Sequence, residues 1–152
     1  MKDKTYPYIA QFAQKDGTFK YRPYLDIIIA STESEMHGKF KALVDSGSDI
    51  TVMDSQIAEF LGIDKKGKEA GRMIGVVESR EGFLAKVNIE VLGFPEVMTF
   101  TVLFIEDLTT SNYDVLLGQQ DFFKRFVVSF DGRRNSFSLR LSPTEDEILS
   151  QS

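Results

Sequence analysis

An aspartate stands between two runs of residues that both read as buried strand. The apolar residues 42–44 precede Asp45, and the strand-forming residues 50–52 follow it. A carboxylate costs free energy in an apolar setting unless it is hydrogen-bonded or partnered. Gly47 permits a tight turn that brings backbone amides toward the carboxylate, and the two serines that flank this glycine can donate or accept hydrogen bonds. The stretch predicts a presented, hydrogen-bonded carboxyl group.

The same residues also fit an ordinary β-turn, because Asp, Ser and Gly are the usual turn formers between strands. The flanking sequence favours a functional loop. Two apolar residues, then Asp-Ser-Gly-Ser, then an Ile/Thr/Val strand resemble the active-site loop of aspartic proteases, and Asp-Val-Leu-Leu-Gly at 114–118 resembles the second hydrophobic-hydrophobic-glycine element of that fold. From about Pro23 to Arg140 the chain resembles a retropepsin-like protease of the small single-domain kind found in retroviruses and prokaryotes.

This resemblance implies an all-β fold, a retropepsin-like closed β-barrel or sandwich with one or two short helices and one lobe per chain. It assigns catalysis to Asp45. The residues that it implies as support of the active-site loop are Ser46, Gly47 and Ser48, and the structural residues of the second motif are Leu117 and Gly118. By analogy with pepsins, the Ser48 hydroxyl is expected to donate to the outer oxygen of the Asp45 carboxylate.

A polar tip at 78–82 lies between strand-like segments at 71–77 and 83–91, which predicts a hairpin. It could be an ordinary hairpin, or, as the resemblance implies, the flap that closes over a substrate. The flap residues expected to contact substrate are Val76, Val77, Glu78 and Ser79. Asp49 is expected beside the bound peptide, because the family carries an acidic residue two positions after the motif glycine.

The chain of 152 residues with 42% hydrophobic content is long enough for one core and one domain. Residues 1–21 are expected to be an N-terminal extension in which 8–12 and 18–21 can pair as a hairpin. Residues 22–141 are expected to be the protease domain, and 142–152 a polar acidic tail. Short helices are predicted at 54–62, capped by Asp54, and at 119–125.

Charge and composition exclude several classes of function. A formal charge of −5 and a pI near 4.9 argue against a nucleic-acid surface. The absence of cysteine excludes disulfides and thiolate metal sites, and the spacing of Asp45, Asp49 and Asp54 fits no Ca²⁺ loop, so we expect no metal and no cofactor. No apolar run approaches the ~20 residues needed to span a bilayer, and the N-terminus leads into no signal-peptide segment. We expect a cytoplasmic protein without a membrane partner.

Peptide hydrolysis without a metal or a covalent nucleophile needs one carboxylate to take a proton from water and another carboxyl group to protonate the carbonyl oxygen. The family uses two aspartates from two such loops. This chain carries Leu117 and Gly118 where a two-lobed pepsin presents a second Asp-Ser/Thr-Gly. We therefore expect a homodimer, with Asp45 of each subunit on a twofold axis, that acts on peptide or protein substrates.

Two alternatives and one departure remain open. The chain could be a catalytically inactive retropepsin-fold module that captures an extended peptide along its strand edges. It could also be a general β-barrel binder of small molecules or nucleic acid. Retroviral members carry an arginine after the second-motif glycine that pairs with the acidic residue near the active loop, whereas Gln119 and Gln120 follow Gly118 here. Another buttress must support the loop.

Overall fold

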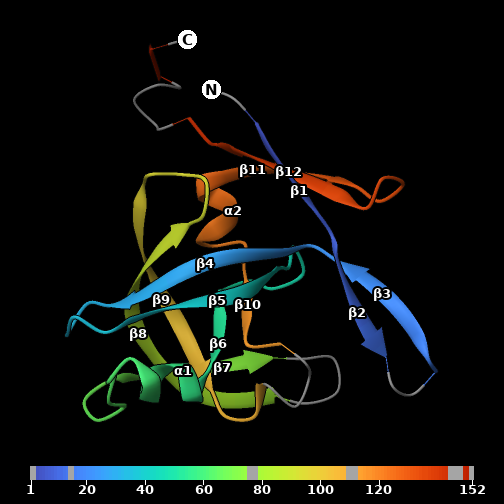
Figure 1. Ribbon diagram of the computed structural model, residues 1–152. Coiled ribbons are helices and arrows are strands. Elements are labelled where there is room, and N and C mark those ends of the chain that lie inside the picture. Colours follow the sequence, from blue (N-terminus) through green and yellow to red (C-terminus); the bar gives the residue numbers. More distant parts are fainter. Residues whose placement is uncertain (1–2, 14–15, 75–78, 109–112, 144–148, 151–152) are drawn as a thin grey trace.

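Six strands close into a barrel. The computed structural model describes residues 3–13, 16–74, 79–108, 113–143 and 149–150 (Figure 1). Within these residues, β8 pairs with both β9 and β4, which closes a ring of β4 (Tyr24–Ser31), β5 (His37–Val44), β10 (Val115–Leu117), β6 (Val52–Asp54), β9 (Val97–Ile105) and β8 (Ser79–Val91). The strand β7 (Glu69–Ile74) extends the sheet beyond β8. The predicted all-β closed barrel with one lobe is confirmed.

The core of the barrel follows from the alternation of apolar residues along its strands. In β4 every second residue is buried, with Leu25, Ile27 and Ile29 at most 1% exposed. The strand β8 alternates in the same way over its second half, where Val87 and Ile89 are fully buried. Each large apolar side chain removed from water contributes about 1.5–3 kcal/mol, so this inward face accounts for much of the stability of the barrel.

Two short helices are described. Helix α1 (Ser55–Phe60) begins after Asp54, whose carboxylate accepts a hydrogen bond from the Gln56 amide at 2.9 Å, as its predicted role as a cap requires. Helix α2 (Phe122–Arg125) is shorter than the predicted 119–125. Asp121 is its N-cap, and the backbone amides of Gln119 and Gln120 before it donate to the carbonyls of Ser48 and Asp49. Neither helix is long and apolar enough to cross a membrane.

The chain ends build a second, smaller sheet. The strand β12 (Ser136–Leu141) pairs with β11 (Phe126–Asp131) on one side and β1 (Lys4–Pro7) on the other. Figure 1 shows this sheet above the barrel. The Tyr6 and Phe137 rings stack at 5.4 Å across β1 and β12. The strand β1, near the start of the chain, therefore belongs to one sheet with β11 and β12.

A separate hairpin stands beside the barrel. The strands β2 (Ile9–Ala13) and β3 (Thr18–Arg22) pair in antiparallel fashion, with Ile9 opposite Arg22, at the place where the sequence suggested a hairpin. Among the described residues, these two strands pair only with each other.

The predicted turn of the β7–β8 hairpin is wrong. Ile74 pairs with Ser79, so 79–82 is strand instead of tip, and residues 75–78 lie outside the described residues. Gly82 misled the prediction because its role is close strand contact. A Cβ atom there would lie 1.9 Å from the Phe104 carbonyl oxygen on β9. The β11–β12 turn is also displaced, since β11 continues through Asp131 and the turn occupies 132–135.

Candidate active site

Asp45 lies where β5 leaves the barrel. The strands β5 and β10 run in parallel, with Val44 beside Leu117. The Asp45 amide then donates to the Leu117 carbonyl at 3.1 Å, which extends the pairing by one step. The strand β5, which leads to Gly47, and the strand β10, which leads to Gly118, therefore end side by side at one edge of the barrel.

A tight turn holds the Asp45 carboxylate. The Gly47 amide donates to Asp45 Oδ1 at 3.0 Å, and the Ser48 amide donates to the Asp45 carbonyl at 3.1 Å. A Cβ atom at Gly47 would sit 3.3 Å from Asp45 Oδ1, so a side chain would crowd the carboxylate. Asp45 itself is half-buried. The glycine thus presents an amide at close range to one oxygen of a partly exposed carboxylate.

The Ser48 hydroxyl does not reach Asp45. It donates to the Ile50 carbonyl at 2.7 Å, two residues further along the same loop. A hydroxyl has one proton to donate, and serines in turns commonly donate it to nearby backbone, so the expected bond to the carboxylate was wrong. Ser48 supports the shape of the loop.

Glutamines replace the missing arginine as the buttress of the loop. The Gln119 side-chain amide donates to the Ser46 carbonyl at 2.7 Å. The backbone amides of Gln119 and Gln120 donate to the carbonyls of Ser48 and Asp49, each at 2.8 Å. Three neutral hydrogen bonds therefore hold the loop against the second motif, and the Asp49 side chain is left exposed.

Thr51 and Asp121 form a polar bridge that the sequence analysis did not find. Thr51 is fully buried, its hydroxyl donates to Asp121 Oδ1, and its amide donates to Asp121 Oδ2 at 3.2 Å. The Thr51 hydroxyl also accepts from the Gly118 amide at 3.1 Å, and Asp121 caps α2 through the Phe122 amide at 2.7 Å. Asp121 was detectable as a cap before an apolar helix, but Thr51 reads as an ordinary strand residue.

We predict that Thr51→Val lowers the free energy of unfolding by about 3 kcal/mol. The substitution preserves shape but leaves the buried Gly118 amide without its partner and removes the hydroxyl bond to the Asp121 carboxylate, which together cost more than one simple lost bond. Urea denaturation at fixed protein concentration measures the change. Thr51→Ser keeps the hydroxyl and should cost about 1 kcal/mol for the lost methyl. Thr101→Val, on the exposed face of β9, should stay within about 0.5 kcal/mol of wild type; an equal loss at Thr51 and Thr101 would refute the bridge.

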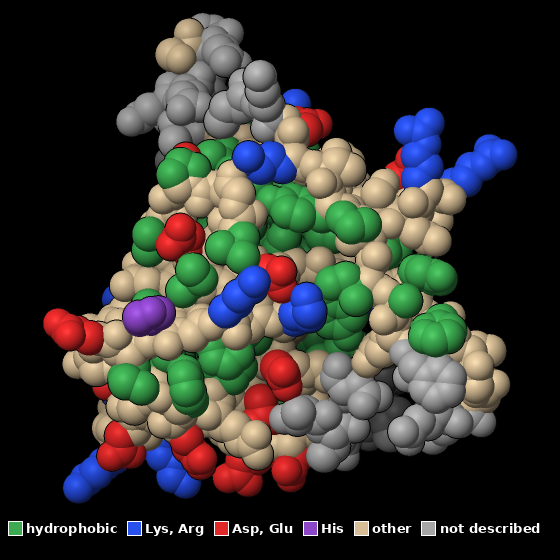
Figure 2. Space-filling model, viewed as in Figure 1, with side chains coloured by type: hydrophobic (Ala, Val, Ile, Leu, Met, Phe, Trp, Pro, Cys, Tyr) green, Lys and Arg blue, Asp and Glu red, His purple; other side chains and the backbone are tan. Residues whose placement is uncertain are grey.

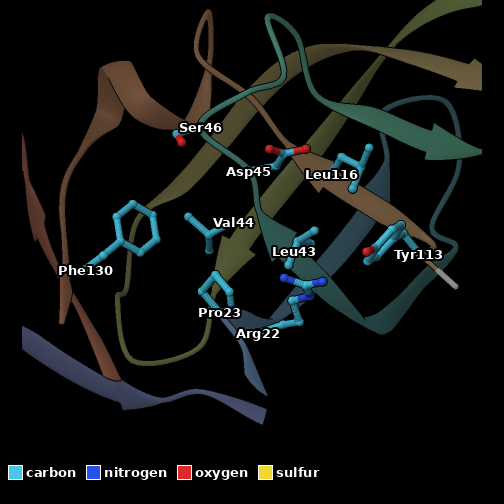
Figure 3. Close-up of a pocket in the computed structure, with 9 residues that line it drawn as sticks. All are labelled: Arg22, Pro23, Leu43, Val44, Asp45, Ser46, Tyr113, Leu116 and Phe130. Carbon is cyan, nitrogen blue, oxygen red and sulfur yellow. The ribbon is translucent and has the colours of Figure 1, made fainter. Parts of the chain in front are cut away.

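Asp45 opens onto a cavity of about 460 Å³. Figure 3 shows the Phe130 and Tyr113 rings on opposite sides of it, with Asp45 between them. The remaining wall combines apolar and polar groups and is formed by Arg22, Pro23, Leu43, Val44, Ser46 and Leu116. The buried Nε of Arg22 has no hydrogen-bond partner among the described residues. The cavity can thus hold an apolar or aromatic group directly beside a carboxylate.

The structure describes only some of the other predicted site residues. Leu117 is fully buried, and a Cβ atom added at Gly118 would lie 2.4 Å from the Ile50 carbonyl carbon. Ser79 is exposed and is the first residue of β8. The predicted substrate contacts Val76, Val77 and Glu78 lie outside the described residues. The part of the chain that the structure describes holds no group of three or more His, Cys, Asp or Glu side chains that could bind a metal ion.

A single-lobed closed barrel, with one carboxylate-bearing loop braced by a strand-and-glycine segment, is the architecture of a retropepsin-like aspartic protease. The sequence profile described as Aspartyl protease matches residues 35–120, which include both the Asp45 loop and Gly118. Because the match covers more than half of the chain, this chain belongs to the aspartyl protease family. No curated protein sequence matches it significantly.

Solved structures share the fold at low sequence identity. A retropepsin-like aspartic protease from Rickettsia conorii is 14% identical, with a TM-score of 0.58 over 91% of this chain and 99% of that chain. The EIAV protease in complex with the inhibitor HBY-793 is 21% identical, with a TM-score of 0.49 over 65% and 83% of the two chains. The retroviral protease-like domain of Ddi1 from Leishmania major is 18% identical, with a TM-score of 0.46 over 82% and 96%.

Proposed function

We propose that this protein is an aspartic endopeptidase that hydrolyses peptide bonds as a homodimer, with Asp45 as its catalytic residue. The observation that carries the proposal is the presentation of Asp45. Among the described residues, the hydrogen bond that reaches its carboxylate comes from the Gly47 amide, and the side chain borders an open cavity instead of forming an ion pair. A carboxylate with a purely structural role would be closed off by partners, as Asp121 is.

The reaction requires two such carboxyl groups. When two carboxylates approach within a few ångströms they cannot both ionise, so the Asp45 pair shares one proton. The ionised member takes a proton from a water molecule as the water oxygen bonds to the peptide carbonyl carbon, and the protonated member gives its proton to the carbonyl oxygen. The resulting tetrahedral diol collapses when the C–N bond breaks: the leaving nitrogen takes a proton from the protonated member of the pair, and one diol hydroxyl gives its proton to the ionised member, which restores the shared proton.

The chain supplies one of these loops, so the second must come from another copy across a twofold axis. In this proposal residues 22–141 form the protease unit, and Ser46, Gly47 and Ser48 keep the loop in shape. Asp49 and the hairpin residues 76–79 contact the bound peptide. The substrate is an extended peptide or protein segment whose apolar side chain enters the cavity beside Asp45.

Specific activity is expected to fall on dilution, because the catalytic pair exists only in the dimer and is lost by mass action. The substrate for this measurement is a peptide found by screening denatured proteins for cleavage sites between pH 3 and 8. Initial rate per subunit is measured across a dilution series and compared with the dimer fraction from sedimentation. The two curves should coincide. Constant specific activity through the range where the protein is monomeric would exclude a shared site.

A further inference from the structure

The β2–β3 hairpin exposes two aromatic side chains. Phe19 is 62% exposed and Tyr21 is 53% exposed. They are two residues apart on β3, so both side chains project from the same face of the hairpin. Figure 2 shows hydrophobic side chains at the right of the molecule, over the hairpin that Figure 1 places beside the barrel. Contiguous exposed apolar surface of this kind can mark a site of contact with another molecule.

The opposite face of the hairpin contacts the barrel of the same chain. Gln11 and Ile9 are half-buried, whereas Ala10 between them is exposed. The Tyr24 hydroxyl donates to Gln11 Oε1 at 3.3 Å, and burial raises the pKa of Tyr24, so it stays a neutral donor. Because a two-stranded hairpin is at best marginally stable alone in water, the hairpin gains from cover on its aromatic face.

The base of the hairpin coincides with the rim of the Asp45 cavity. The strand β3 ends at Arg22, and both Arg22 and Pro23 line that cavity. A twofold arrangement that brings two Asp45 side chains together places the partner chain beside this cavity, and the base of the hairpin lies on the cavity rim. Figure 1 shows the hairpin on the same side of the barrel as the loop that joins β5 to β6. The exposed aromatic face is thus continuous with the surface where the second copy must dock.

We propose, building on the homodimer of the proposed function, that the β2–β3 hairpin is a dimerisation arm that packs Phe19 and Tyr21 against a second copy of this chain. In a twofold dimer each subunit contributes one arm and receives the other. Aromatic side chains are enriched among the residues that dominate binding energy, which suits this pair to the role. The arm also links dimer formation to the Asp45 cavity, because β3, which bears Phe19 and Tyr21, ends at Arg22 in the cavity wall.

A tryptophan probe tests the arm directly. The natural chain has no tryptophan, so Phe19→Trp introduces a single reporter that keeps an aromatic anchor. Its emission is expected to shift to shorter wavelength, and its quenching by acrylamide to fall, over the concentration range in which sedimentation shows dimer formation. Val97→Trp is the matched control, since Val97 is 61% exposed on β9 and outside both the hairpin and the cavity. Its emission should stay that of an exposed indole at every concentration.

A double variant measures the strength of the arm. Phe19→Ser with Tyr21→Ser should raise the dimer dissociation constant by about 10- to 100-fold, the range for removing one or two aromatic anchors. Val97→Ser should leave it unchanged, and circular dichroism with urea unfolding checks that each variant is folded. If the double variant does not fold, the Phe19→Trp emission decides the question alone.

The outcomes separate the arm from the enzyme. If the dimer dissociation constant is the same for wild type and the double variant, and the Phe19→Trp emission stays that of an exposed indole, the dimerisation arm is refuted while the proposed protease function is unaffected. A reporter that becomes buried when a substrate peptide is added to the monomer would also overturn it, because the occupant would then be substrate. A dimer that depends on the arm but cleaves no peptide would overturn the protease and keep the arm.

Discussion

Asp45→Asn is expected to reduce kcat for peptide hydrolysis by about 10³-fold or more, because the amide can neither accept the proton of water nor donate the shared proton to the carbonyl oxygen. Fold and assembly should survive, since the side chains have the same shape and the Gly47 amide can still donate to the side-chain oxygen that replaces Asp45 Oδ1. The measurement is kcat and KM on one peptide, with sedimentation of the variant. Asp26→Asn, on the outer face of β4 where Asp26 pairs with Lys41, is the matched control and should change kcat by less than about twofold.

Mixing adds a sharper test of the shared site. If subunits exchange freely, an equimolar mixture of wild type and Asp45→Asn contains wild-type, mixed and variant dimers in the ratio 1:2:1. Mixed dimers carry one carboxylate and should be inactive, so activity per wild-type subunit is expected to fall to about half. Activity that stays unchanged after exchange, or an Asp45→Asn variant that cleaves at the wild-type rate, would contradict a paired Asp45 mechanism.

Gly118→Ala is expected to lower the free energy of unfolding by about 3 kcal/mol or more and to remove activity with it. A Cβ atom at Gly118 would lie 2.4 Å from the Ile50 carbonyl carbon and 2.6 Å from its oxygen. Both atoms are backbone, so no side-chain rotation relieves the overlap, and the loop that carries Asp45 must move. The same movement would break the bond from the Gly118 amide to the Thr51 hydroxyl.

Gly132→Ala is the control for this substitution. Gly132 lies in the β11–β12 turn and has no heavy atom within 4 Å of an added Cβ. Its replacement should leave stability within about 0.5 kcal/mol of wild type, or raise it slightly by restricting the unfolded chain. Urea unfolding of both variants at one protein concentration makes the comparison. A Gly118→Ala protein as stable and active as Gly132→Ala would show that the second motif does not support the loop.

Local patterns predicted the features that depend on neighbouring residues. Asp54 was recognised as a helix cap because the bond to Gln56 spans two residues. The turn of Asp45 around Gly47 is equally short-range, and its amide donates as expected. The closed all-β barrel was expected from the family resemblance, and the alternation of buried residues along β4 and β8 gives each of these strands one face toward the common core.

Contacts between distant residues were decided only by the tertiary structure. Thr51 meets Asp121 across 70 positions, and no local signal marks a strand threonine as the partner of a helix-capping carboxylate. Gly82 resembled a turn because glycine serves both turns and close strand contacts, and only the carbonyl of Phe104 distinguishes the two.

The sequence by itself determined that a carboxylate would be presented at the end of β5, because that outcome needs only a buried strand, a glycine turn and the cost of a bare charge. Which groups would hold that loop was a matter of tertiary structure. Gln119 replaces the expected arginine, and the Ser48 hydroxyl turns to Ile50, because hydrogen bonds go to whichever polar atoms the packed backbone brings within reach. Those atoms become neighbours only when β5 and β10 lie side by side.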